Sequence, residues 1–148
     1  MDDTYTLVTT KEIDAPLERV WDAWHDPAKI AKWWGPAGFH STVKELDVRE
    51  GGRFEVVMHG PDGTDYENLY LFDRVEERRQ LVYTNVGSAR FGLAPFQSVF
   101  DLEAVGNRTR VVLKARFVSE EDRRKHVEEF GAIEGTRELL QRLEEQAG

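Results

Sequence analysis

The chain has 148 residues, a length typical of one domain, and its 28 acidic and 20 basic residues give a net charge of −8 at pH 7. This charge repels phosphate backbones and anionic lipid surfaces, so we expect neither nucleic acid nor a membrane as a partner. The absence of cysteine excludes disulfides, thiolate metal ligands and cysteine nucleophiles. Because the sequence shows no signal peptide and no membrane-spanning stretch, we expect a single cytoplasmic domain over residues 1–148.

The first expected elements are a strand at about residues 5–13 and a short helix. Pro16 suits the first turn of that helix, because its missing N–H costs nothing there. Apolar residues then recur at helical spacing, with Trp21 and Trp24 on the same face. We therefore expect an amphipathic helix that is anchored to the core by these two tryptophans.

A second short helix follows, with Asp26 as its expected cap and Pro27 in its first turn. It contains Trp33 and Trp34 and should end at the Gly-Pro pair of residues 35–36. All four tryptophans thus fall within one short stretch, and side chains of this size form either a core or one wall of a pocket. The functional hypothesis concerns Trp33 and Trp34, because the helix end beside them suits the mouth of a cavity.

Six strands are expected next, because short segments alternate apolar and polar residues between turns rich in Gly, Pro, Asp and Asn. Their approximate bounds are 41–48, 53–58, 65–75, 81–86, 96–104 and 108–118. In the last strand one face is formed by Thr109, Val111, Leu113, Ala115 and Phe117, whereas the other face is mostly basic. This pattern is typical of an antiparallel sheet with one wet face and one covered face.

The covering element is the C-terminal segment, about residues 119–146, which we expect to form one long helix. The run Ser119-Glu-Glu-Asp122 resembles a capping box at its start. Its apolar stripe consists of Val127, Phe130, Ile133, Leu139, Leu140 and Leu143. Gly131 and Gly135 lie one turn apart inside the expected helix, where they allow either close packing against the sheet or room for a guest molecule.

Five stretches, which together span nearly the whole chain, carry a family resemblance. They are Ala15-Pro-Leu-Glu-Arg-Val-Trp-Asp-Ala-Trp24, Asp26-Pro27 followed by Trp33-Trp34, Arg49-Glu-Gly-Gly-Arg-Phe54, Met58-His-Gly-Pro-Asp-Gly63 and Gly135-Thr-Arg-Glu-Leu-Leu-Gln-Arg-Leu143. The chain resembles the homologues of the activator of heat-shock-protein-90 ATPase, or AHSA-type proteins, a branch of the SRPBCC or START-related (birch-allergen-like) superfamily. Two departures are Thr136, where family members often carry Trp, and the absence of a Pro from the turn at residues 76–79.

The resemblance implies an α+β helix-grip fold, in which a curved antiparallel sheet wraps around a long C-terminal helix in the order β-α-α-β-β-β-β-β-β-α. In many members of the superfamily, the space between sheet and helix holds a lipid, a polyketide or another hydrophobic molecule. Other members are cyclases, stress-response proteins or chaperone partners. The fold alone therefore does not name the ligand.

Polar residues on two neighbouring strands are the strongest candidates for a ligand site. Alternation places Tyr66, Asn68, Tyr70 and Phe72 on one face of the strand at 65–75, and Tyr83 and Asn85 on one face of the next. If that face is concave, they line an apolar cavity together with Trp33, Trp34, Phe54, Val56, Met58, Phe96, Phe100, Ile133 and Leu140. The alternative is that the tyrosine hydroxyls reach the rim and the asparagines serve turns or the outer face.

The sequence contains no recognisable catalytic or metal constellation. Its histidines, His25, His40, His59 and His126, lack the spacing of metal ligands, so we expect neither a metal nor a cofactor. A nucleophile elbow, a phosphate-binding loop and a dinucleotide fingerprint are also missing.

Three functions are compatible with these observations. The leading hypothesis is non-catalytic binding of a small hydrophobic or aromatic ligand, by a chain that is either a monomer or a homodimer. The second is a chaperone-associated protein-binding module, related to the co-chaperones of heat-shock protein 90. The third is a cyclase- or dehydratase-like enzyme for polyketides, in which a tyrosine donates a hydrogen bond to a developing enolate.

Overall fold

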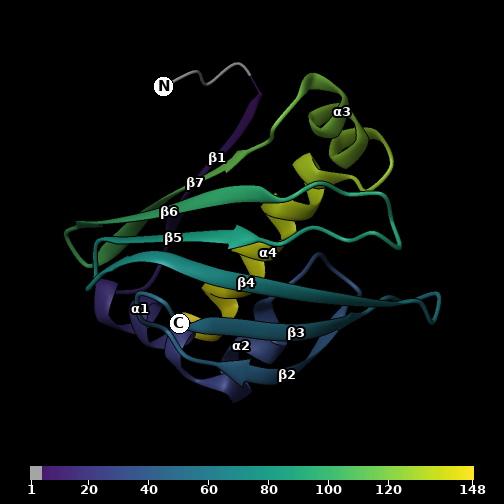
Figure 1. Ribbon diagram of the computed structural model, residues 1–148. Coiled ribbons are helices and arrows are strands. Elements are labelled where there is room, and N and C mark those ends of the chain that lie inside the picture. The colour runs from purple at the N-terminus through teal and green to yellow at the C-terminus, as the bar shows by residue number, and fades with distance from the viewer. Residues whose placement is uncertain (1–4) are drawn as a thin grey trace.

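The computed structural model describes residues 5–148, which form seven strands and four helices (Figure 1). In chain order these are β1 (Thr6–Ile13), α1 (Leu17–His25), α2 (Pro27–Trp33), β2 (His40–Leu46), β3 (Arg53–His59), β4 (Asp65–Glu76), β5 (Gln80–Asn85), β6 (Phe96–Val105), β7 (Arg108–Arg116), α3 (Glu120–Glu128) and α4 (Ala132–Ala147). Each strand lies within about three residues of its expected bounds. The α+β helix-grip architecture predicted from the sequence is confirmed.

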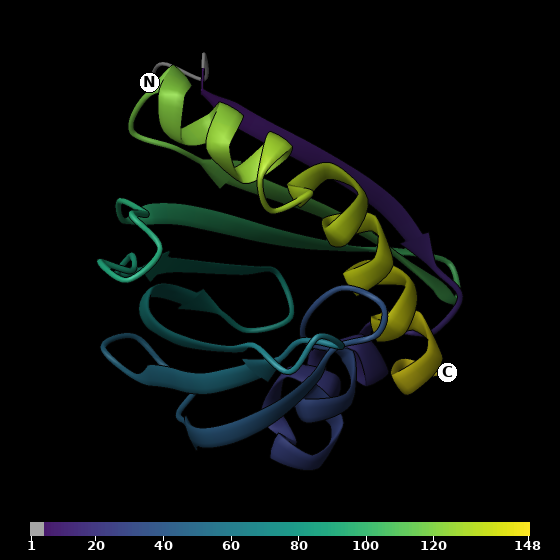
Figure 2. The ribbon, with the colours of Figure 1, turned by 90° about the vertical axis from the view of Figure 1, so that its right-hand side faces the viewer.

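The sheet is antiparallel throughout, in the order β1-β7-β6-β5-β4-β3-β2. Its register shifts once in β2, between Val43 and Glu45, and once in β4, between Phe72 and Arg74. Such bulges bend a strand and increase its local twist, which contributes to the curvature of the sheet in Figure 2. The concave side faces the helices, and α3 and α4 run one after the other along it.

The two N-terminal helices form as the sequence predicts. Asp26 caps α2, because its carboxylate accepts a hydrogen bond from the Ala28 N–H at 2.9 Å, and Pro27 follows as the first helical residue. The two helices are joined by a buried hydrogen bond of 3.0 Å, donated by the Trp33 indole N–H to the Ala23 carbonyl. This bond places the tryptophans of both helices in one cluster under the sheet.

Trp24 is the centre of that cluster and is fully buried. Its ring lies 5.3 Å from that of Trp33, 5.4 Å from that of Tyr83 and 5.2 Å from that of Phe100, measured between centroids. Most of these ring pairs are edge to face or tilted, the arrangements that aromatic quadrupoles favour. The part of the sheet above α1 and α2 is therefore packed solid with aromatic side chains.

The prediction of a single long C-terminal helix was wrong, because the segment is divided into two helices, α3 and α4. Gly131 has a φ of +61° and stands at the start of α4 in the left-handed conformation, which residues with a Cβ rarely adopt. On either side of the break, Phe130 and Ile133 are 39% and 42% exposed instead of covered by the sheet. The expected cap at Ser119 is present, and its hydroxyl accepts a hydrogen bond from the Asp122 N–H.

Gly135 lies inside α4, facing the segment between α2 and β2. A Cβ added to it would lie 3.5 Å from the Cβ of Pro36, an ordinary van der Waals contact. This position supports close packing rather than space for a guest molecule. Within residues 5–148, no helix is both long and apolar enough to cross a membrane.

Candidate ligand-binding site

Two adjoining pockets lie between the sheet and the C-terminal helices. The outer pocket has a volume of about 380 Å³, and the inner pocket has a volume of about 150 Å³. Three side chains, those of Tyr70, Phe96 and His126, line both pockets. They form the boundary that a molecule must pass to move from one pocket to the other.

The wall of the outer pocket comes from five parts of the fold. It is lined by Pro36 and Phe39 after α2, by Met58 of β3, by Tyr66, Glu67, Asn68 and Tyr70 of β4, by Asn85, Ser88, Phe91, Leu93 and Phe96 around the loop between β5 and β6, and by His126, Glu129 and Phe130 at α3. The loop and α3 lie at the same end of the molecule (Figure 1). Lys125 of α3 holds the two together by donating a hydrogen bond of 3.1 Å to the Gly92 carbonyl.

An asparagine pair provides the polar part of the outer pocket. The Asn85 side-chain N–H donates to the Asn68 side-chain carbonyl at 3.0 Å. The Asn85 carbonyl accepts from the Gly87 N–H at 2.8 Å, and the Asn68 N–H donates to the Tyr66 backbone carbonyl at 3.2 Å. The two amides therefore connect β4, β5 and the start of the loop, and most of their hydrogen-bonding capacity is used within the protein.

The inner pocket is mainly apolar and contains two buried tyrosines. Burial raises the pKa of Tyr70, and hydrogen bonding to the side chains of Asn85 and Trp34 offsets part of the rise. Burial also raises the pKa of Tyr83 well above its ordinary value of 10.0, with the neighbouring Tyr70 adding to the rise and a hydrogen bond to Ser98 opposing it. Both phenols therefore stay protonated at neutral pH and act as hydrogen-bonding groups.

Arg142 of α4 fixes the rim of the site, and nothing in the sequence pointed to it. One guanidinium nitrogen donates hydrogen bonds of 2.9 Å to the carbonyls of Gly35 and Pro36. The other donates to the carbonyls of Lys32 and Phe39, the latter at 2.9 Å. Partial burial lowers the pKa of Arg142, but a guanidinium remains charged at neutral pH. A single side chain thus pins the whole segment from α2 to β2 onto the C-terminal helix.

The predicted site residues fall into three groups in the structure. Those that line the pockets between sheet and helices are Trp34, Met58, Tyr66, Asn68, Tyr70, Tyr83, Asn85 and Phe96. Those that are fully or almost fully buried and line neither of these two pockets are Trp33, Phe54, Val56, Phe72, Phe100 and Leu140. Ile133 lies on the outer surface of α4. The two members of the expected tryptophan pair therefore separate, with Trp34 beside the inner pocket and Trp33 in the core.

The sequence reading missed His126, the loop residues Phe91 and Leu93, and Thr136 of α4. The Phe91 ring stacks on that of Tyr66 with a centroid distance of 4.9 Å, so the loop covers part of the outer pocket. Thr136 lines the inner pocket, and its hydroxyl donates to the Ala132 carbonyl at 2.7 Å. Two signals in the sequence pointed toward them: Thr136 stands where family members often carry Trp, and Phe91 and Leu93 belong to an apolar loop that could gate a cavity or seal a dimer.

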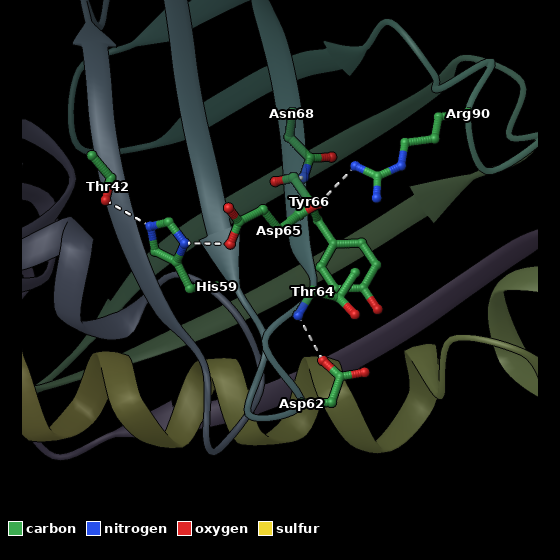
Figure 3. A network of polar contacts seen from close by, with 8 residues as sticks. All are labelled: Thr42, His59, Asp62, Thr64, Asp65, Tyr66, Asn68 and Arg90. Atoms are coloured by element: carbon green, nitrogen blue, oxygen red, sulfur yellow. Dashed lines mark hydrogen bonds and ion pairs between the residues drawn. The ribbon is translucent and has the colours of Figure 1, made fainter.

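A polar network lies near the site, at the ends of β2, β3 and β4 (Figure 3). The two ring nitrogens of His59 lie 2.7 Å from the Thr42 hydroxyl and 2.7 Å from the Asp65 carboxylate. Hydroxyl, imidazole and carboxylate in this order resemble an acid–base relay, but Thr42 and Asp65 are exposed and line none of the pockets described here. We therefore infer that the network stabilises the β3–β4 hairpin. Arg90 contributes by donating a hydrogen bond to the Asp65 backbone carbonyl.

A separate groove runs along the outside of the molecule, between the edge strand β1 and α4. Its volume is about 940 Å³, and its walls include Val8 and Lys11 of β1 and Ile133 and Arg137 of α4. Basic and acidic side chains alternate along it, with Glu134 and Glu138 on the same helix. Leu7, Thr9 and Ala132 line both this groove and the inner pocket, but the groove carries many more charged side chains.

The fold and the pockets define a helix-grip protein of the START-related class. The match to a known family is direct, because the family model described as Activator of Hsp90 ATPase homolog 1-like protein covers residues 14–148. The chain belongs to this family. Among curated protein sequences, none matches the chain significantly.

Solved structures of similar proteins share this fold. A protein from Arthrobacter aurescens superposes with a TM-score of 0.89 at 29% identity, over 99% of this chain and 88% of that chain. Protein Ms6760 from Mycobacterium smegmatis superposes with a TM-score of 0.84 at 29% identity, over 96% of this chain and 90% of that chain. The AHSA1 protein from Silicibacter pomeroyi, at 24% identity and a TM-score of 0.76 over 95% and 96%, shares the fold.

Proposed function

We propose that this protein binds a small hydrophobic or aromatic molecule in the two pockets between the sheet and the C-terminal helices, without transforming it. The observation that carries the proposal is the pair of adjoining pockets that share Tyr70, Phe96 and His126. The outer pocket alone falls within the range of about 300–1,000 Å³ in which small-molecule sites occur. Its lining combines aromatic rings with a few polar groups, which is the composition that such sites have.

The state of the polar groups favours binding over catalysis. The amides of Asn68 and Asn85 are hydrogen-bonded to each other, and the phenol of Tyr83 is influenced by the Ser98 side chain. A general acid or base works best with a pKa near the working pH, whereas burial moves the pKa of both inner tyrosines upward, away from neutrality. These groups are suited to orient a ligand rather than to exchange protons with it.

Thr136 supports a ligand of appreciable size in this particular chain. Relatives often carry Trp at the corresponding position, and in this structure Thr136 lines the inner pocket. A Trp side chain there would fill space that is open in this protein. We therefore expect the inner pocket to be a feature of the present chain that many relatives lack.

The experiment that tests the proposal is a thermal-shift screen of small aromatic and lipid-like compounds, repeated with Thr136→Trp. A ligand that binds only the folded protein raises its melting temperature, and the rise grows with the logarithm of the ligand concentration above Kd. We expect compounds that stabilise the natural protein to lose this effect in Thr136→Trp and to keep it in Arg137→Trp, in which the same side chain is added on the exposed face of α4. A screen without any stabilising compound, or stabilisation that survives in Thr136→Trp, contradicts the proposal.

A second candidate function, binding of a partner protein, is favoured by the groove between β1 and α4. β1 is an edge strand, so one side of its backbone is not paired within the sheet, and the groove beside it carries charges of both signs. The family description supports a chaperone of the heat-shock-protein-90 type as that partner. Calorimetric titration with the host's heat-shock-protein-90 homologue tests this candidate, and binding that is weakened by Ile133→Glu supports it.

A further inference from the structure

His126 is the one histidine that the fold buries. Only 9% of its surface is exposed, although it belongs to α3, which is otherwise a polar helix. Its ring lies 4.7 Å from that of Phe96, 4.5 Å from that of Phe117 and 6.2 Å from that of Phe130, measured between centroids. A polar imidazole is thus enclosed by three phenyl rings at the passage between the two pockets.

The other buried polar groups of the inner pocket have polar neighbours inside the protein. The Tyr83 phenol is influenced by the Ser98 side chain, and the Tyr70 phenol by the side chains of Asn85 and Trp34. His126 differs, because within residues 5–148 its buried ring has no hydrogen-bond partner. The ring nitrogens of His126 are not fully enclosed by protein atoms, in contrast to Trp24 Nε1, which is enclosed and unpaired.

A buried polar group without a partner costs free energy, which a ligand can recover by supplying the missing hydrogen bond. We propose that His126 is the polar anchor of the ligand, with an unprotonated ring nitrogen that accepts a hydrogen bond from a ligand hydroxyl. This inference rests on the proposed function and narrows the ligand to uncharged aromatic or polycyclic molecules that carry a hydroxyl group. The phenyl rings around His126 provide the apolar surface for the rest of the molecule.

The charges around His126 favour an uncharged ligand over a carboxylate. On its own helix it faces Asp122 and Lys125, of which Lys125 is engaged by the Gly92 carbonyl. From the sheet it faces the protonated phenols of Tyr70 and Tyr83 across the two pockets. Apart from His126, the charged residues that line the outer pocket are acidic, Glu67 of β4 and Glu129 after α3, whereas the Arg90 guanidinium lies over the Phe91 ring at 4.9 Å. An anion would therefore meet carboxylates on entry, and burial keeps the imidazole neutral, as its lowered pKa indicates.

The test compares two probes that differ only at the hydroxyl, 2-naphthol and 2-methoxynaphthalene. We expect isothermal titration calorimetry at pH 7.5 to show about three- to tenfold tighter binding of 2-naphthol to the natural protein, the range of one neutral hydrogen bond. In His126→Phe, which keeps an aromatic ring and removes the acceptor, the preference should disappear. In His126→Gln, which keeps an acceptor, part of it should return.

The outcomes separate this inference from the proposed function. If the natural protein and His126→Phe prefer 2-naphthol over 2-methoxynaphthalene equally, His126 is not the polar anchor, and the pocket remains a ligand site. Failure of the natural protein to bind 2-naphthol also overturns the anchor, and it overturns the proposed function only if the compound screen is empty as well.

A second measurement needs no variant and applies even if His126→Phe does not fold. Protonation of His126 removes its acceptor, so binding of 2-naphthol should weaken as the pH falls below the ordinary histidine value of 6.5, while binding of 2-methoxynaphthalene changes less. Parallel pH profiles for the two probes contradict the role of His126.

Discussion

The two ends of the space beneath the sheet differ in how they are filled. Above α1 and α2, the rings of Trp24, Trp33 and Phe100 pack edge to face. Toward α3, the same sheet covers two pockets, and the side chains there include a paired set of amides and a buried imidazole. Trp34 and Tyr70, with ring centroids 5.3 Å apart, stand at the border between the two ends.

Under the proposed function, one curved sheet serves two purposes. The filled end stabilises the fold through close packing of large apolar surfaces. The hollow end is closed by α3 and by the loop between β5 and β6, which are joined by one hydrogen bond from Lys125 to Gly92 and by ring contacts of Phe91. The proposed function therefore assigns stability and binding to different ends of the space beneath the sheet, and each end can be changed separately.

The largest effect is expected at the filled end. Trp24→Ala should lower the free energy of unfolding by about 3–5 kcal/mol, because it removes a fully buried ring and leaves a void among its neighbours. Phe91→Ala, at the hollow end, should cost about 1 kcal/mol, since that ring is partly exposed and stacks mainly on Tyr66. Urea denaturation of both variants measures the difference. Equal losses in the free energy of unfolding would contradict the distinction between the two ends.

The border between the ends depends on Arg142. Arg142→Met should lower the free energy of unfolding by about 1.5–3 kcal/mol, because it leaves the carbonyls of Gly35, Pro36 and Phe39 without their charged donor. The matched control is Arg137→Met on the exposed side of the same helix, where a surface ion pair with Glu134 is worth about 0.5 kcal/mol or less. If the two variants unfold at the same urea concentration, the hydrogen bonds of Arg142 do not stabilise the fold.

The break between α3 and α4 is tested by a pair of glycine substitutions with opposite expected signs. Gly131→Ala should destabilise the protein by about 1 kcal/mol, because a Cβ is strained at a φ of +61°. Gly135→Ala should stabilise it by about 0.5–1 kcal/mol, because alanine favours the helix and its Cβ makes an ordinary contact with Pro36. Thermal unfolding of both variants resolves the signs, and a stabilising Gly131→Ala would indicate a continuous helix.

The smallest effect is a pH dependence of stability from His126. Burial lowers its pKa in the folded state below the ordinary value of 6.5, so the unfolded chain takes up the proton more readily. The stabilising contribution is complete above pH 6.5 and is lost as the pH falls toward the folded-state pKa. We expect His126→Phe to lose less stability than the natural protein between pH 7 and pH 5. A steeper loss in the variant would contradict a neutral, buried imidazole.

Much of the fold could be predicted because local patterns determine it. The alternation of apolar and polar residues predicted all the strands. The sequences Asp-Pro at Asp26 and Ser-Glu-Glu-Asp at Ser119 predicted the two helix caps. The break at Gly131 was missed, because apolar residues on both sides continue the helical spacing. Only tertiary packing shows that Phe130 and Ile133 are exposed and do not belong to a core stripe.

The candidate site was predictable mainly in its sheet half, with Trp34 as the exception. Tyr66, Asn68 and Tyr70 alternate on β4, and strand geometry alone places them on one face. Arg142 looked like any polar residue of a helix, because its carbonyl partners are more than 100 positions away in the chain. The burial of His126 could not be predicted for a similar reason, since it depends on Phe96 at the start of β6 and Phe117 just after β7, which only the folded chain brings against α3.

The most direct test of the account is a titration of the ¹⁵N-labelled protein with 2-naphthol, followed through the indole N–H signals of its four tryptophans. The account predicts that the Trp34 signal shifts, together with the backbone amides of α3 and of residues 87–95, because Trp34 borders the inner pocket. The signals of Trp21 and Trp24 at the filled end should stay nearly in place. Shifts confined to Trp21, or to the groove between β1 and α4, would contradict the assignment of binding to the hollow end.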